Sequence, residues 1–155
     1  MRGPRRILVV EDGHEYVDAF RLLADAGGGG ASLERAGNLA EARAALAASP
    51  PDAVFVDVVF DRTPETELAG DLDALVARYG GDRVHAVRHL AAHQGFYVLD
   101  ALADELGGVR VVLAYDFTGE EKRLEALRLR IPDLSGLPDG TSLGAALDFL
   151  LRPLA

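Results

Sequence analysis

The sequence predicts an α/β fold built around a doubly wound, five-stranded parallel sheet. Short apolar runs alternate with helical patterns along the chain, and acidic residues directly follow two of these runs and lie just after a third. The runs are continuous rather than alternating in polarity, which is typical of strands that are buried on both faces. Strands and helices that alternate in this way form a parallel sheet covered by helices on both sides. The 155 residues fit one domain, so we expect a single domain over 1–155.

The first half of the chain predicts three strands and two helices. The strand-like runs are residues 6–10, 32–36 and 53–56. Residues 14–25 carry apolar side chains at helical spacing, which predicts the first helix. Asn38, with Glu41 three residues later, has the pattern of a capping box and therefore predicts the start of the second helix.

The second half of the chain predicts two further strands and at least two helices. A strongly apolar run and an amphipathic pattern cover residues 109–113 and 142–151, which we interpret as a strand and the last helix. Thr118, followed by Glu121, predicts the start of another helix. The fifth strand is poorly marked, and either 127–131 or 134–137 could form it.

The connection between the strands at 53–56 and 109–113 is much longer than the dozen or so residues that a crossover needs. Residues 95–106 have the pattern of the expected crossover helix, so residues at about 59–94 form an insertion. Two helical patterns, 65–79 and 82–93, lie within it. An insertion with its own structure at the strand ends is typical of a lid or a binding element.

Composition excludes several classes of function. The chain has no cysteine, so disulfides, thiolate metal sites and a cysteine nucleophile are excluded. It has 16 Lys and Arg against 25 Asp and Glu, a net charge of −9, so we expect no nucleic-acid and no membrane partner. No apolar run approaches the length of a membrane span, and residues 1–6 do not resemble an export signal, so we expect a cytoplasmic protein.

Acidic residues follow the strands at the point where each strand ends. Glu11 and Asp12 follow the first strand, Asp57 follows the third and Asp116 lies just after the fourth. Because the carboxyl ends of parallel strands meet at one edge of a sheet, we expect these carboxylates to converge there. Converging carboxylates repel one another unless a cation lies between them, and Mg²⁺ prefers such oxygen ligands. A carboxylate beside Mg²⁺ can also attack phosphorus and form an aspartyl phosphate.

Four segments resemble the receiver domain of response regulators. They are the strand and acidic pair at 7–12, the helix start at 37–42, the strand and aspartate at 51–57, and the helix start at 94–99. The resemblance covers about 6–58 and 94–115. It implies a flavodoxin-like sheet of strand order 2-1-3-4-5.

The resemblance also implies a role for each acidic residue. Asp12 would bind Mg²⁺ directly, and Glu11 would act through a water molecule. Asp57 would be the phosphoacceptor, and the backbone carbonyl of Val59 would complete the metal site.

Two residues that the family uses to bind the phosphoryl group are absent. The family has a lysine before a proline at the end of the fifth strand, where this chain has Ile131-Pro132 or Leu137-Pro138. The only lysine, Lys122, lies in the predicted fourth helix of the family pattern. The Ser or Thr that ends the fourth strand is replaced by Ala114 or Tyr115. The arginines that could replace the lysine are Arg130, Arg128 and Arg62.

Other residues carry two interpretations each. Tyr115 could be a switch residue that couples the acidic site to the next helix, or a packed aromatic residue. Asp61 and Asp116 could be further metal ligands, but loop acids are the simpler interpretation. Three histidines at helical spacing could share a zinc ion, but a solvated or partner-binding face is favoured. They are His85, His89 and His93.

These observations predict an atypical, stand-alone receiver domain of two-component signalling. It would bind Mg²⁺, accept a phosphoryl group on Asp57 from a histidine kinase or phosphotransfer protein, and bind a downstream protein target, with a homodimer left open. The first alternative is a receiver-like interaction module that works without phosphorylation. The second is a metal-dependent phosphohydrolase, which ranks low because 57–61 lacks the Asp-x-Asp pattern of such enzymes. We therefore expect that the protein is a signalling domain and not an enzyme.

Overall fold

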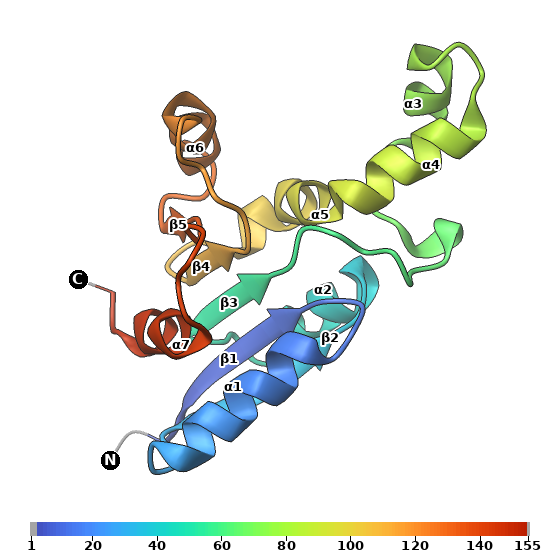
Figure 1. The fold of residues 1–155 in the computed structure, drawn as a ribbon. Helices are drawn as coiled ribbons and strands as arrows, with labels where there is room; N and C mark the ends of the chain where they lie inside the picture. Colours follow the sequence, from blue (N-terminus) through green and yellow to red (C-terminus); the bar gives the residue numbers. More distant parts are fainter. Residues whose placement is uncertain (1–2, 155) are drawn as a thin grey trace.

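The computed structural model describes residues 3–154, which form a five-stranded parallel sheet with helices on both faces. The strand order is β2-β1-β3-β4-β5, as the sequence predicts (Figure 1). The strands are β1 (Arg5–Val10), β2 (Ala31–Ala36), β3 (Ala53–Val56), β4 (Arg110–Leu113) and β5 (Leu134–Ser135). The α-helices are α1 (Glu15–Ala26), α2 (Leu39–Ala48), α3 (Leu72–Arg78), α4 (Arg83–Ala92), α5 (Gln94–Leu102), α6 (Glu121–Arg128) and α7 (Leu143–Leu151). Two short 3₁₀ helices are η1 (Glu65–Glu67) and η2 (Ala103–Glu105).

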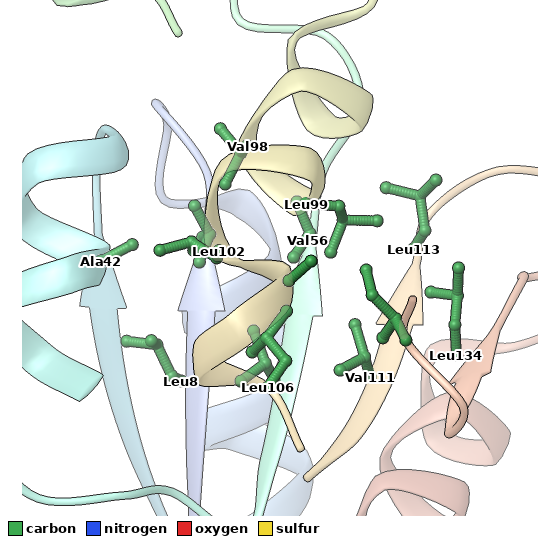
Figure 2. Packing of buried hydrophobic residues seen from close by; sticks show 14 of the residues in the cluster. Leu8, Ala42, Val56, Val98, Leu99, Leu102, Leu106, Val111, Leu113 and Leu134 are labelled. Carbon is green, nitrogen blue, oxygen red and sulfur yellow. The ribbon is translucent and has the colours of Figure 1, made fainter. Parts of the chain in front are cut away.

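Each face of the sheet has its own apolar cluster. On one face, side chains of the central strands pack against α2 and α5, with Val56, Leu99 and Leu102 among them (Figure 2). On the other face, Phe20 and Phe55 pack among residues of α1 and α7. Every residue of β3 is buried, so burial on both faces explains why its sequence is continuously apolar.

The segment between β3 and α5 projects from the sheet as a helical hairpin. Helices α3 and α4 extend away on the side of the strands' carboxyl ends, with α4 leading directly into α5 (Figure 1). The hairpin has a small apolar cluster of its own, formed by Leu75, Ala86 and Leu90. These helices occupy the part of the chain in which the sequence predicts an insertion.

The buried side chain of Gln94 fixes the base of this hairpin. Its amide oxygen accepts a hydrogen bond from Ala69 N at 2.5 Å, and its amide nitrogen donates to the carbonyls of Ala69 and Leu90 at 3.0 and 3.2 Å. Gln94 is fully buried. A buried amide with three hydrogen bonds holds two chain segments in one geometry.

Several helix starts and ends differ from the sequence predictions. The predicted helix at 65–79 is η1 followed by the shorter α3, because Gly70, at φ 115°, turns the chain between them. The predicted start at Thr118 is wrong: its amide bonds the Asp116 side chain, and α6 begins at Glu121. Of the two candidates for the fifth strand, β5 lies in 134–137 and covers only two residues. The Asn38 start is confirmed, since its side chain accepts from Glu41 N at 2.8 Å.

Among the described residues, no helix has both the length and the apolar character that crossing a bilayer requires.

Candidate functional site

Strand register brings three acidic residues to one edge of the sheet. Val10 of β1 pairs with Val56 of β3, so the residues that follow them, Glu11 and Asp57, leave the sheet side by side. The backbone pairing continues past the strands, because Asp57 N donates to the Val10 carbonyl at 2.9 Å. Asp12 follows Glu11 in the β1–α1 loop. The edge therefore carries Glu11, Asp12 and Asp57, as the sequence predicts for parallel strands.

Glu11 is a buried carboxylate that caps helix α1. Its side chain is 1% exposed. Its two oxygens accept hydrogen bonds from Tyr16 N at 3.2 Å and Val17 N at 2.7 Å, in the first turn of α1. The free amides and the dipole at this end of the helix stabilise a negative charge. Both carboxylate oxygens are thus already engaged by the protein.

Asp12 ties the β1–α1 loop to the loop that follows β3. Its Oδ2 accepts a hydrogen bond from Arg62 N at 2.6 Å and a longer one from Thr63 Oγ1 at 3.3 Å. The Arg62 guanidinium meanwhile bonds Glu15, the first residue of α1, at 2.6 Å. These contacts therefore hold the loop after β3 against the β1–α1 loop and the first turn of α1.

Asp57 is the most perturbed carboxyl of this edge. Burial and, to a smaller extent, the nearby carboxylates of Glu11, Asp12 and Glu15 together raise its pKa to about 6, against the lowering effect of the hydrogen bond from Val58 N. That hydrogen bond, at 2.8 Å, goes to Oδ1. The raised pKa reflects this burial together with the closeness of the other carboxylates.

The donor atoms left free at this edge fit Mg²⁺. Within residues 3–154, no hydrogen bond reaches Oδ2 of Asp57, Oδ1 of Asp12 or the carbonyl of Val59. No three His, Asp or Glu side chains of these residues are arranged to hold a metal ion by themselves. Magnesium does not need them, since it is typically bound by one or two carboxylates and completes its shell with waters. The oxygens left without hydrogen bonds therefore belong to two carboxylates and one carbonyl, while both oxygens of Glu11 accept hydrogen bonds.

Gly95 sets the position of the loop that carries Val59. The first turn of α5 packs against this loop, and Gly95 N donates to the Val58 carbonyl at 3.0 Å. A Cβ atom at Gly95 would collide with the Asp57 carbonyl oxygen and lie 2.9 Å from Val58 Cα. Only glycine allows this approach, which leaves Val59, 48% exposed, outside the core.

The positions of the missing lysine and hydroxyl are apolar. Because β5 ends at Ser135, it is Leu137-Pro138 that follows the strand, and Ile131-Pro132 precedes it. Ala114 N donates to the Val56 carbonyl at 2.9 Å, so Ala114, rather than Tyr115, lies beside Asp57. Ala114 and Leu137 both pack against the cluster on the α1 and α7 face. Neither residue can donate a side-chain hydrogen bond to a phosphoryl group.

The three arginines proposed from the sequence have different surroundings. Arg130 forms an ion pair with Asp100 of α5. Arg128 donates to the carbonyl of Leu134 at 2.8 Å. Of the three, Arg62 is the arginine that contacts the acidic edge. The structure therefore gives Arg130 and Arg128 partners away from the acidic edge.

Tyr115 lies in an aromatic cluster beside α6. Its hydroxyl donates to Glu120 Oε2 at 2.6 Å, and this hydrogen bond raises the pKa of Tyr115. Its ring packs edge-on against Phe96 and Phe117, at 5.1 and 4.9 Å between centroids. Arg123 lies over Phe96, 4.0 Å from the ring centroid. Tyr115 is thus a packed aromatic residue whose hydroxyl points toward α6.

Asp116 joins two loops. Its oxygens accept hydrogen bonds from Thr118 N at 2.8 Å and Asp139 N at 3.0 Å, and the hydrogen bonds with Thr118 and Asp139 lower its pKa to about 2. The interpretation as a loop acid fits this geometry. Asp61 is exposed.

The three histidines lie on the hairpin and contact aromatic residues. His85 stacks on Tyr79 at 4.2 Å between ring centroids, and His89 Nδ1 lies 3.1 Å from the Tyr79 hydroxyl. His93 Nδ1 bonds the carbonyl of His89 at 2.9 Å. With Arg88, the histidines line a surface groove of about 430 Å³. A solvated or partner-binding face describes them better than a zinc site.

Two residues of the edge are missed by the sequence analysis. Arg35, at the end of β2, donates to the carbonyls of Gly13 at 2.5 Å and Asp12 at 2.8 Å. Its place could have been inferred, because β2 pairs with β1 and also ends at this edge. Glu15, the partner of Arg62, has no sequence signal that distinguishes it from an ordinary acid in a first helical turn.

Comparisons with known proteins were made by sequence and by structure. No family model and no curated protein matches the sequence. Solved structures do match. A transiently phosphorylated "switch" in bacterial signal transduction aligns with TM-score 0.60 at 15% identity, over 97% of this chain and 94% of that one. The response regulator CheY4 of Vibrio cholerae aligns with TM-score 0.58 at 15% identity, over 95% and 96%. The receiver domain of NtrX from Brucella abortus aligns with TM-score 0.57 at 17% identity, over 93% and 92%.

The chain therefore has the fold of response-regulator receiver domains. This likeness extends over almost the whole chain. The acidic edge lies at the strand ends where open parallel sheets bind their ligands.

Proposed function

We propose that the protein is an atypical receiver domain that binds Mg²⁺ and accepts a phosphoryl group on Asp57. The observation that carries this proposal is the half-buried Asp57, which lies at the end of β3 beside Glu11 and Asp12 and whose Oδ2 accepts no hydrogen bond within residues 3–154. Mg²⁺ would be bound by Asp12, Asp57 and the Val59 carbonyl. Glu11 would act on the ion through a water molecule. When bound, Mg²⁺ would neutralise the phosphoryl oxygens during transfer.

The transfer step needs a donor with an activated phosphorus. A carboxylate oxygen of Asp57 attacks the phosphorus of a phosphohistidine, the phosphorus–nitrogen bond breaks, and its electron pair stays with the imidazole nitrogen. The product on this chain is an aspartyl phosphate. The donor is a histidine kinase or a phosphotransfer protein, and the added charge biases the loops that follow β3 and β4 toward binding a downstream protein.

The proposal is tested by labelling with a small phosphodonor such as acetyl phosphate. We expect intact-protein mass spectrometry to show one added phosphoryl group in Mg²⁺, none in EDTA and none in Asp57→Asn. Asp61→Asn, which removes an exposed acid of the same loop, should be labelled like the wild type. Wild-type protein that stays unlabelled in Mg²⁺ would overturn the proposal.

A second candidate is an interaction module with the receiver fold that has no phosphoryl chemistry. Ala114 and Leu137 favour it, because they replace both residues that would bind the phosphoryl group. This candidate predicts that partner binding is the same for wild type and Asp57→Asn, whether or not a phosphodonor is present.

A further inference from the structure

Within residues 3–154, the arginine side chains that contact the acidic edge differ in what they bind. Two arginines contact this edge. The guanidinium of Arg35 is already bound to the backbone, because its Nε and Nη2 atoms donate to the carbonyls of Gly13 and Asp12. Arg62 differs, since its backbone amide donates to Asp12 while, among residues 3–154, its guanidinium bonds only the side chain of Glu15.

The Arg62–Glu15 ion pair is exposed and easily exchanged. The two side chains are 59% and 64% exposed. Exposed ion pairs of this kind contribute little to stability. Gly13 leaves room for the pair, because a Cβ atom there would collide with both charged groups. The guanidinium can therefore leave Glu15 without disturbing the core.

A phosphoryl group on Asp57 would be a stronger partner for Arg62 than Glu15 is. It carries about −1.5 to −2 charges and three acceptor oxygens, whereas Glu15 carries one charge. Arginine binds phosphate oxygens through paired, charge-assisted hydrogen bonds. Asp12, whose carboxylate accepts the Arg62 backbone amide, follows β1, and β1 pairs with β3 up to the residue before Asp57.

We propose that Arg62 binds the phosphoryl group in place of the missing lysine. Until Asp57 is phosphorylated, Arg62 stays in its ion pair with Glu15. This inference rests on the proposed phosphorylation of Asp57. It adds a consequence at the surface, because exchange of partners would release the loop after β3 from the first turn of α1.

The test compares four variants by the extent of labelling with acetyl phosphate and by the half-life of the aspartyl phosphate. Arg62→Gln should lower the extent of labelling about tenfold, the effect of losing a charge-assisted hydrogen bond. Arg62→Lys should restore most of it. Glu15→Gln should raise labelling by about two- to fivefold, because it releases Arg62 from its pair. The matched control is Arg83→Gln, which breaks the ion pair between Arg83, also 59% exposed, and Glu65.

Each outcome decides one claim. If Arg62→Gln is labelled like Arg83→Gln, or if lysine does not restore labelling, Arg62 does not bind the phosphoryl group. If Glu15→Gln leaves labelling unchanged or lowers it, Glu15 does not compete with the phosphoryl group for Arg62. If the wild type itself is unlabelled in Mg²⁺, the proposed function falls and this inference falls with it. Equal thermal unfolding of the four variants checks that all of them are folded.

Discussion

The Asp57 carboxylate is held in surroundings that oppose its charge. Ionisation of this group therefore lowers the free energy of unfolding. Its pKa in the folded protein is about 6, against an ordinary value of 3.8. Between these two values the folded protein binds more protons than the unfolded chain does. The free energy of unfolding therefore falls as pH rises through this window.

Asp57→Asn should consequently stabilise the metal-free protein. At pH 7.5 in EDTA we expect the free energy of unfolding to rise by about 1–3 kcal/mol, because the amide carries no charge in the same surroundings. Urea unfolding at pH 4.5 and pH 7.5 measures this, and the gain should shrink at the lower pH. Asp61→Asn, as an exposed control, should change little. A variant less stable than wild type at pH 7.5 would contradict this interpretation of the site.

Glu11 has the opposite character, since the charge of this buried carboxylate is compensated by two backbone amides. Glu11→Ala should lower the free energy of unfolding by about 2 kcal/mol, because it leaves the first turn of α1 without its cap. The measurement is urea unfolding, with Glu34→Ala on exposed β2 surface as the control. Equal loss in both variants would mean that Glu11 does not cap the helix.

Among the secondary-structure elements, the approach of α5 to the loop after β3 depends on one missing side chain. Gly95→Ala would force Asp57 and Val58 away from α5. We expect a loss of about 1–3 kcal/mol in the free energy of unfolding, together with weaker Mg²⁺ binding. Gly107→Ala is the matched control, because a Cβ atom there meets nothing within 4 Å. Unchanged stability of Gly95→Ala would show that this contact is loose.

The hairpin should likewise depend on Gln94. Gln94→Leu leaves the amide and carbonyl of Ala69 without partners in a buried position, which costs about 1–3 kcal/mol. Hydrogen exchange should become faster at Ala69 and in the hairpin over 72–92, while β1 and β3 keep their protection. Uniformly faster exchange would show that the hairpin does not open separately from the sheet.

The elements that sequence predicts well are those whose residues are buried by the sheet itself. β1, β3 and β4 are apolar along most of their length because helices cover both faces, and this pattern is visible without a structure. β5 pairs through only two residues, which is too short for any periodicity. The start of α6 is missed because the Asp116 side chain binds the amide of Thr118, a contact that depends on the loop geometry.

At the scale of the whole molecule, the parallel topology of the sheet explains which part of the site could be predicted from the sequence. Convergence of Glu11, Asp12 and Asp57 follows from parallel topology, so acids from two separate segments could be placed together. The Arg62–Glu15 pair joins a loop after β3 to a helix after β1, and no local pattern marks either partner. The engagement of Glu11 by α1 is also a product of packing, which the sequence resemblance alone does not provide.

The chain carries a net charge of −9, and this site gathers part of that charge where solvent cannot fully screen it. A Mg²⁺ titration followed by backbone amide chemical shifts tests whether a cation binds there. We expect saturable shifts confined to 11–13 and 57–63, which are lost in Asp12→Asn and Asp57→Asn and kept in Asp148→Asn on the exposed side of α7. Shifts that are scattered over the surface, or that persist in Asp12→Asn and Asp57→Asn, would contradict a magnesium site at this edge of the sheet.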